Sequence, residues 1–346
     1  MEDPQFSSYT EQASIYARLW SLDRSDPQWA CQESRYFSSI LSKSNCVTTS
    51  LIDLPSLLGE RPISNSKFNN GTSDISEFTY HPSNPLEPLV LFDSNGNPVA
   101  ARVPLNDPHA LIPSLENSVR KLPLKLAAGK SVATRGGFRV FAYGVHADYS
   151  PAPRYNADYI SHQPASSAFI SNDAKPAIDI LSRWYRFLRP SEWAETQNVV
   201  LPAGLERRAG PWTTLTINVP DVSRPQDGEG GIKKSVVSKP HTDVLDHKLS
   251  MTGVIPFRWD GNWEKGRVVL FPLKTVLEVG RGEAYLMFGA AMHHGNLPDE
   301  ESGRGSLVCH SRASIHNWWI KQQLAALERE REATRAEAGG DPQAEI

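Results

Sequence analysis

Short hydrophobic runs dominate the chain after about residue 210. They are separated by turns rich in Gly, Asp and Pro, and they contain the β-branched and aromatic residues that favour strands. Closely spaced antiparallel strands of this kind predict a β-sandwich or a barrel. The runs are, in order, WTTLTINV, SMTGVIPF, GRVVLFPL, KTVLEV, EAYLMF and GSLVCHS.

The first two-thirds of the chain contain one clear hairpin and one clear helix. In LVLFDSNGNPVAARV, two β-rich runs flank Asn95 and Gly96, a pair that is a strong signal for a hairpin turn. The segment KPAIDILSRWYRFLRP has helical periodicity, and Pro190 is expected to end the helix. The residues expected on its buried side are Ile178, Leu181, Trp184, Tyr185 and Leu188.

The N-terminal region is predicted to combine short helices with a loop. Residues 8–22 space their apolar side chains as an amphipathic helix would, and residues 30–41 are a candidate second helix. Residues 60–85 are rich in Ser, Asn and Pro without any period, which predicts a surface loop or a locally disordered segment. Residues 221–239 predict a second, mobile loop.

The C-terminal segment HNWWIKQQLAALEREREATRAEA predicts a helix that ends in a solvated face of mixed charge. The residues expected to anchor it are Trp318, Trp319, Leu324 and Leu327. No internal repeat and no linker separates two domains, so we expect one domain with long decorations. The expected parts are a helical and loop extension at 1–85, a hairpin and helices at 86–208, a β-rich core at 209–315, and a helix and tail at 316–346.

The cysteine content and the absence of long apolar runs indicate the cellular compartment of the protein. Three cysteines in 346 residues are too few for a disulfide scaffold and lack the paired spacing of a zinc site. The first residues are acidic and polar, unlike a signal peptide, and no apolar run approaches the roughly 20 residues of a membrane span. We therefore expect an intracellular protein of the nucleus or cytoplasm that is neither secreted nor inserted in a membrane.

One basic stretch stands out in a chain whose net charge is -3. Residues 117–145 contain no acidic residue. The stretch is the predicted contact for DNA phosphates, and an ordinary solvated face is the equally open alternative. Its basic residues are Arg120, Lys121, Lys125, Lys130, Arg135 and Arg139.

The stretch KPHTDVLDH contains a candidate pair of metal ligands. His241 and Asp243 are spaced at strand period, so both side chains can point to one face. Alone, this triplet is more often an ordinary polar turn. A second histidine, His294, follows the β-rich run GEAYLMFGAAMHHGN. Two imidazoles and one carboxylate form the facial triad of non-heme Fe(II) oxygenases.

The run GRGSLVCHSR supplies groups that suit a carboxylate ligand. Arg304 and Ser306 are two residues apart and would share one face of a strand. Arginine offers a planar fork for a bidentate ion pair, and serine adds a hydrogen bond. Together they could hold the distal carboxylate of 2-oxoglutarate, whereas a structural surface ion pair is the alternative for Arg304.

These motifs resemble Fe(II)/2-oxoglutarate oxygenases, and within them the TET/JBP-like branch, including its smaller fungal members. The strings that carry the resemblance are AGPWTTLTINV, HTDVLD, HGN and RGSLV, within residues 209–315. The resemblance implies an α+β protein whose catalytic core is a double-stranded β-helix, of the jelly-roll or cupin type, with flanking helices. It also implies Fe(II) and O2, with 2-oxoglutarate as cosubstrate, and oxidation of the methyl group of a methylated base such as 5-methylcytosine or N6-methyladenine in DNA.

The resemblance further implies roles for single residues. His241, Asp243 and His294 would bind iron, and Arg304 and Ser306 would hold 2-oxoglutarate. The residues implied in binding the substrate base are Asp246, His310 and Arg312. Two positions depart from the family: Arg312 replaces a histidine, and Lys265 with Gly266 replaces paired glycines.

Three other polar residues have weaker assignments. Asn218 is assigned to 2-oxoglutarate, although a polar residue near a strand end is an equal explanation. His293 should point away from His294, either behind the ligands or into solvent. His247 is expected to be exposed rather than to support the site.

Three alternatives for the function remain open from the sequence. The first keeps the oxygenase chemistry but acts on a small molecule, a free nucleoside or a protein side chain. The second is a non-enzymatic binding module on the same fold, with residues 117–145 as its contact surface. The third is a zinc hydrolase with the same three ligands, in which Arg304 and Ser306 would have no role.

Overall fold

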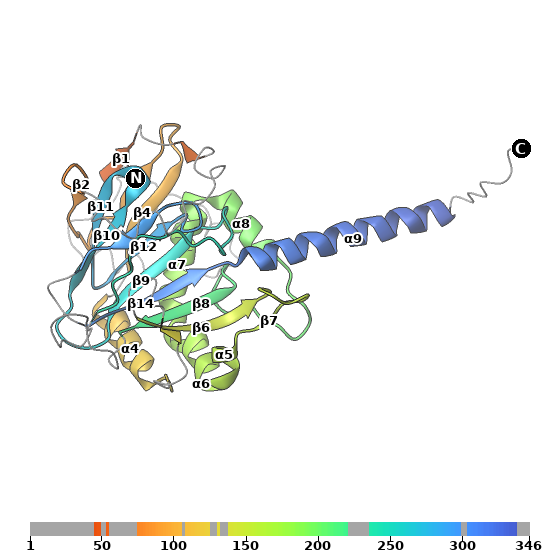
Figure 1. Cartoon of the computed structure of the whole chain (residues 1–346), viewed down its shortest axis with the longest axis horizontal. Helices are drawn as coiled ribbons and strands as arrows, with labels where there is room; N and C mark the ends of the chain where they lie inside the picture. Colours follow the sequence, from red (N-terminus) through yellow and green to blue (C-terminus); the bar gives the residue numbers. More distant parts are fainter. Residues whose placement is uncertain are drawn as a thin grey trace, which may run out of the picture.

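Two β-sheets and a set of helices around them make up the folded body of the chain (Figure 1). The computed structural model describes residues 45–49, 53–54, 75–105, 108–124, 130–131, 138–220, 235–298 and 303–337. The predicted helices at 8–22 and 30–41, and most of the predicted loop at 221–239, lie outside these residues. No helix in the described part of the chain is long and apolar enough to cross a bilayer.

The larger sheet has ten strands in the order β1-β3-β4-β12-β9-β14-β8-β6-β5, and β7 also pairs with β6. Its central strands are antiparallel to their neighbours, and only the edge strand β1 runs parallel to its partner β3. The bounds are β1 Asn45–Thr48, β3 Leu89–Phe92, β4 Pro98–Pro104, β5 Lys130–Ser131, β6 Arg139–His146, β7 Arg154–Tyr155, β8 Thr214–Val219, β9 Thr252–Arg258, β12 Glu283–Met287 and β14 Arg304–His310.

The smaller sheet has four strands in the order β13-β10-β11-β2. They are β2 Thr79–His81, β10 Lys265–Leu270, β11 Thr275–Gly280 and β13 His294–Asn296. An isolated bridge between His241 and His294 adds the start of the predicted metal motif to the edge of this sheet. The prediction of a loop at 60–85 is wrong at β2, which pairs in parallel with β11.

The chain alternates between the two sheets from β8 onward, and this alternation defines the double-stranded β-helix that was expected. It runs from β8 to the His241 bridge, then through β9, β10 and β11, β12, β13 and β14. Each of the six predicted β-rich runs contains a strand. The predicted α+β fold class is therefore confirmed.

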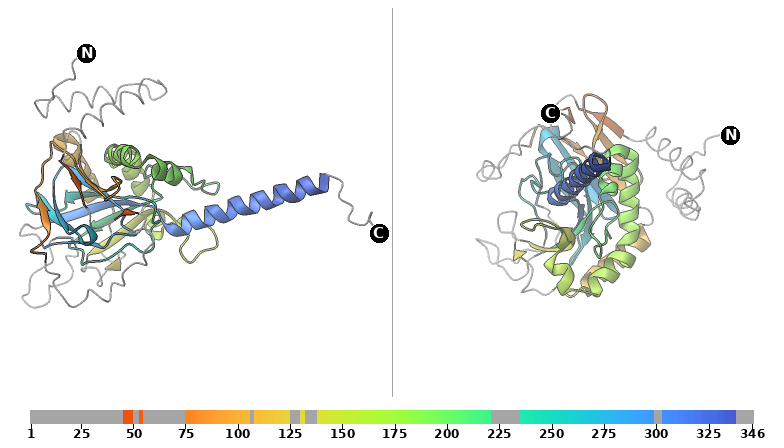
Figure 2. Two further views of the ribbon diagram at one scale, coloured as in Figure 1. Left: turned by 90° about the horizontal axis from the view of Figure 1, so that it is seen from above. Right: turned by 90° about the vertical axis from the view of Figure 1, so that its right-hand side faces the viewer.

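Helices cover one face of the larger sheet (Figure 2). The predicted helix is α7, and its expected apolar side is buried. It ends at Leu188 because Arg189 precedes a proline, and Pro190 then opens α8. At Gly253 in β9, an added Cβ would lie 2.3 Å from Leu181 Cδ2, so the glycine lets α7 approach the sheet. The helices of the body are α4 Pro108–Lys121, α5 Ala157–Ser161, α6 Ala165–Ala168, the π-helical turn η3 Phe169–Asp173, α7 Lys175–Leu188 and α8 Pro190–Asn198, and a 3-10 turn, η4 Phe271–Leu273, joins β10 to β11.

The predicted hairpin is formed by β3 and β4. Gly96 has a φ of 79°, a conformation that glycine adopts without strain. The Asp93 carboxylate accepts hydrogen bonds from the backbone N–H of Asn95 and Asn97, at 2.9 and 2.6 Å. The turn is thus held by its own side chain, as sequences of this type predict.

The C-terminal helix, α9 Ala313–Glu337, projects from the body (Figures 1 and 2). Ile315 is fully buried at its start, and Trp319 packs beside it on a small apolar cluster. The predicted anchoring by Leu324 and Leu327 is wrong, because both side chains are about half exposed. They lie beyond the body of the protein, where no described element reaches them.

Candidate active site

A cavity of about 300 Å³ opens on the inner face of the larger sheet. Strands β6, β8, β9, β12 and β14 supply most of its wall, and the loop after His241 and strand β13 close one end. All nine site residues singled out in the sequence line this cavity: Asn218, His241, Asp243, Asp246, His294, Arg304, Ser306, His310 and Arg312.

The three predicted metal ligands lie together at one end of the cavity. One ligand atom from each residue falls within 4.8 Å of the other two. Nε2 of His241 is 3.5 Å from Oδ1 of Asp243, and Nε2 of His294 is 3.7 Å from Oδ2 of the same carboxylate. The bridge between His241 and His294, with reciprocal backbone bonds of 2.8 and 2.9 Å, brings the two rings together.

The other ring nitrogen of each histidine points away from the carboxylate and is held by the backbone. Nδ1 of His241 lies 2.8 Å from the carbonyl oxygen of Lys239, and Nδ1 of His294 lies 2.9 Å from that of Met292. A carbonyl can only accept, so Nδ1 carries the proton and Nε2 presents its lone pair. Metal-binding histidines are oriented in this way, and the donor set therefore fits a divalent metal.

The turn that carries Asp243 is fixed by the backbone. Asp243 N donates to Gly289 O at 3.0 Å, and an added Cβ on Gly289 would come within 3.1 Å of Asp243 Oδ2. The absence of a side chain at residue 289 thus leaves room for the carboxylate. This glycine was not identified from the sequence.

Arg304 and Ser306 lie on β14, and both side chains face the cavity. Only 2% of Arg304 is exposed, and no carboxylate among the described residues forms an ion pair with it. Asn218, opposite Ser306 in the adjacent strand β8, donates from Nδ2 to Ser306 Oγ at 3.1 Å. A buried guanidinium is costly without an anion, so this end of the cavity fits a carboxylate ligand.

Two residues beside Arg304 were missed in the sequence. With the Asn296 amide oxygen turned toward Arg304, Nη1 and Nη2 donate to it at 3.0 and 3.1 Å. Tyr285 on β12 also contacts Arg304; burial raises the pKa of its phenol, and Arg304 opposes that effect. The alternation of inward and outward side chains along β12 could have identified Tyr285. Asn296 could have been identified because it is the asparagine of the HGN string.

The three predicted substrate residues form a bonded network on one side of the cavity. Asp246 Oδ1 lies 3.0 Å from His310 Nδ1 and 3.1 Å from Arg312 Nη1. The other imidazole nitrogen of His310 is 2.9 Å from Thr216 Oγ1. Arg312 also donates from Nε and Nη2 to Asp148 Oδ2, at 3.0 and 2.6 Å. His310 and Arg312 therefore hold Asp246 in place, and Asp148 was not foreseen.

The structure decides between the two predicted positions of His293 and corrects the prediction for His247. His293 is 3% exposed, with Nδ1 3.3 Å from Thr242 Oγ1, so it is buried behind the ligands and does not face solvent. The expectation that His247 is exposed is wrong, because its ring stacks on that of His316. Burial lowers the pKa of both His247 and His293 to about 4.

The basic stretch at 117–145 is only partly free to bind phosphates. Arg120 donates to the carbonyl oxygens of Trp259 and Arg258, both at 2.8 Å, and so fastens α4 to the end of β9. Arg139 is buried, whereas Lys121 is exposed. The side chains of Lys125, Lys130 and Arg135 lie outside the part of the structure that is described.

Comparisons with known proteins find likeness only at the level of solved structures. No protein-family model matches the chain, and neither does any curated protein. One similar structure is described as NgTET1 in complex with 5mC DNA; it is 15% identical, covers 77% of this chain and 93% of its own, and has a TM-score of 0.49. Another is an oxidoreductase of the 2OG-Fe(II) oxygenase family from Burkholderia pseudomallei, 14% identical, with coverage of 62% and 86% and a TM-score of 0.36.

Proposed function

We propose that this protein is an Fe(II)- and 2-oxoglutarate-dependent dioxygenase. The observation that carries the proposal is one cavity that holds both a triad of two histidines and a carboxylate and a buried arginine without a carboxylate partner among the described residues. A zinc hydrolase would use the triad but would have no reason to bury Arg304 beside it.

His241, Asp243 and His294 would hold the iron, and their three ligand atoms leave positions for a cosubstrate. Arg304, with Ser306 and Tyr285 beside it, would hold the distal carboxylate of 2-oxoglutarate. Fe(II) with bound 2-oxoglutarate supplies an oxidant made from O2 that hydroxylates a C–H bond, while 2-oxoglutarate becomes succinate and CO2.

We further propose that the substrate is a methylated nucleobase, with DNA as its carrier and 5-methylcytosine or N6-methyladenine as candidates. The supporting observation is the network around Asp246. Oδ1 of Asp246 is occupied by His310 and Arg312, which leaves Oδ2 to accept from an exocyclic amine. A cavity of about 300 Å³ lies at the lower end of ligand sites, so a base would have to leave the helical stack to enter.

One observation favours a second candidate, a small molecule such as a free nucleoside. Arg120 and Arg139 of the basic stretch are engaged or buried within the protein, which reduces the positive charge available to a DNA backbone. The chemistry of the cavity would be the same in both cases. Only the size of the molecule that carries the oxidised group would differ.

The test is a reaction with Fe(II), 2-oxoglutarate and ascorbate, followed by mass spectrometry of succinate and of methylated DNA, RNA and nucleosides. We expect succinate from the parent and from Glu206→Ala, which removes an exposed carboxylate outside the cavity. Asp243→Ala should abolish turnover, because the triad loses its carboxylate. Equal succinate production by Asp243→Ala would refute the dioxygenase. Oxidation of nucleosides but of no polymer would select the second candidate.

A further inference from the structure

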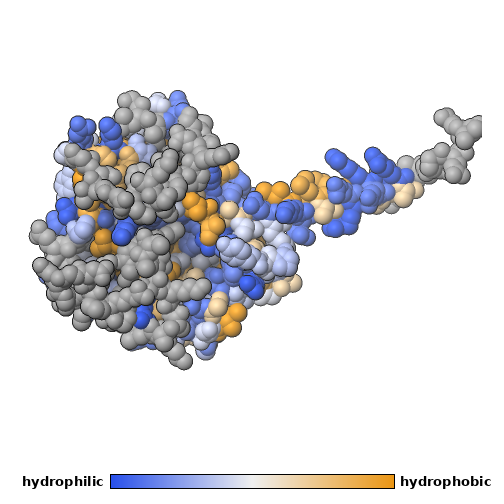
Figure 3. Space-filling model, in the orientation of Figure 1, coloured by the Kyte–Doolittle hydropathy of each residue, from blue (hydrophilic) through white to orange (hydrophobic). Residues whose placement is uncertain are grey.

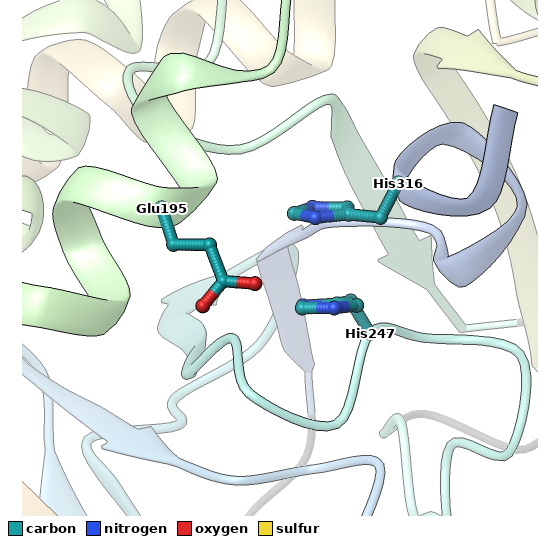
Figure 4. Close-up of side chains that lie close together, drawn as sticks. All are labelled: Glu195, His247 and His316. Atoms are coloured by element: carbon teal, nitrogen blue, oxygen red, sulfur yellow. The ribbon is translucent and has the colours of Figure 1, made fainter. Parts of the chain in front are cut away.

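A second cluster of potential metal ligands lies outside the cavity, where three separate segments meet. Glu195 comes from α8, His247 from the loop that follows Asp243, and His316 from the first turn of α9. In Figure 4 the two imidazole rings lie one above the other, and the Glu195 carboxylate points toward their edges. One ligand atom from each residue lies within 4.8 Å of the other two.

The two histidines have nitrogens that nothing in the described part of the protein satisfies. Their rings stack with centroids 3.7 Å apart and an interplanar angle of 7°. Nδ1 of His247 and Nε2 of His316 are buried and lack a hydrogen-bond partner among the described residues. His316 is only 2% exposed. Buried polar atoms are usually paired, so two such nitrogens close to a carboxylate are available to bind a ligand.

Both imidazoles are in the protonation state that binds metals. Burial lowers the pKa of His247 to about 4, and burial together with His247 and Arg207 lowers that of His316 to about 3. At neutral pH each ring is therefore uncharged and has one nitrogen with a free lone pair. Glu195 is exposed and can supply the negative charge that a divalent ion requires.

We propose that Glu195, His247 and His316 bind a divalent transition metal ion of the zinc class at a second site, separate from the triad in the cavity. Two imidazole nitrogens and one carboxylate oxygen are ordinary zinc ligands, and a water molecule would complete a tetrahedron. With metal-nitrogen bonds of about 2.0 Å, the two nitrogens must come to about 3.3 Å, so the rings splay from their parallel stack. Rotation of two side chains is sufficient for that change.

The bound ion would fasten both helices to the loop that contributes Asp246 to the cavity. This loop is already attached to the start of α9, because His247 N donates to Ser311 O at 2.7 Å and Ala313 N donates to Leu245 O at 3.0 Å. The ion would add α8 to the same junction. It would thereby stabilise the loop without touching the cavity.

The experiment uses full-length protein in which His241→Ala and Asp243→Ala have removed two of the three ligands in the cavity. After chelator treatment, this protein is dialysed against Zn2+ and its metal content is measured, and Co2+ is titrated while the visible absorption is recorded. We expect one equivalent of Zn2+ and the intense visible bands of tetrahedral Co2+. Zn2+ should also raise the thermal unfolding midpoint.

Matched variants in the same background separate metal binding from packing. His316→Phe keeps a flat ring on His247 but removes the ligand, and Glu195→Gln keeps the shape of the side chain but removes its charge. We expect His316→Phe to remain folded and to lose affinity for Zn2+ by about 100-fold or more. No binding by the background protein, or equal binding by His316→Phe, would overturn the proposal and leave the two histidines as a packed neutral pair.

Discussion

The surroundings of two arginines in the cavity decide which of them is available to a ligand. Arg312 is paired with Asp148 and Asp246, so its charge is already neutralised inside the protein. The side chain of Arg304 contacts the neutral groups of Asn296 and Tyr285, and no carboxylate among the described residues forms an ion pair with it. Arg304 is therefore the residue expected to bind an anion, and Arg312 the residue that orients Asp246.

Replacing Arg304 with alanine should weaken binding of 2-oxoglutarate. The change removes a charge-assisted contact worth about 1.5 to 3 kcal/mol, which corresponds to about a 10- to 150-fold rise in the required concentration. Arg312→Ala is the matched control, and it should leave this requirement within about threefold of the parent. Succinate formation measured against 2-oxoglutarate concentration tests both variants, and a parent-like curve for Arg304→Ala would contradict the assignment.

At the scale of elements, β14 carries more of the candidate site than any other strand described. Arg304, Ser306, Val308 and His310 line the cavity, because alternate side chains of a strand face one side. The strand begins after Gly303, which has a φ of 98°. A Cβ added at this position would lie 1.2 Å from Asp260 O, so no side chain fits there. This close approach of the β9–β10 turn fixes where β14 starts, and hence which residues face inward.

The buried side chains of the long helix α9, Ile315 and His316, lie in its first turn. Figure 3 shows apolar surface along the projecting helix. Its exposed apolar side chains include Ile320, Leu324 and Leu327. Ending the chain at Glu328 should therefore change the free energy of unfolding by no more than about 0.5 kcal/mol. Ile315→Ala, at a fully buried position, should lower it by about 2 to 4 kcal/mol. Urea unfolding of the two proteins checks both values, and a large loss from the truncation would show that the exposed part has a partner.

At the scale of the whole molecule, the packing of α9 depends on the charge of two histidines. His247 and His316 have pKa values of about 4 and about 3 in the folded protein, below the ordinary value of 6.5. The unfolded chain therefore binds more protons than the folded protein between these values. The stabilisation is complete above about pH 6.5 and is lost as the pH falls toward the folded values.

The free energy of unfolding, measured with a chelator present, should accordingly decrease from about pH 7 to about pH 5, by at most about 1.4 kcal/mol per pH unit for each histidine. His316→Phe should show a shallower decrease, because one titrating group is gone and His247 loses a neighbour that could become charged. The histidines other than His247 and His316 contribute equally to both proteins. The difference between the two pH profiles therefore reports on this pair. Identical pH profiles would contradict the buried neutral state of His316.

Local spacing in the sequence predicted the strands and showed which candidate site residues share a strand face. A period of two puts Arg304, Ser306 and His310 on one face of their strand, whatever the rest of the chain does. The same local rules identified the hairpin turn at Gly96 and the buried side of α7. These features depend on backbone geometry within a few residues, and the local order of side chains is sufficient to determine that geometry.

Tertiary structure alone decided which groups meet across long separations. The pairing of Arg312 with Asp148, the stack of His247 on His316 and the position of Tyr285 beside Arg304 all join segments far apart in the sequence. The exposure of Leu324 and Leu327 likewise depends on where the body ends, because a helical pattern shows which side is apolar but not whether anything covers it. Such contacts follow from how the sheets and helices pack, and the periodicity of a single segment carries no information about its distant neighbours.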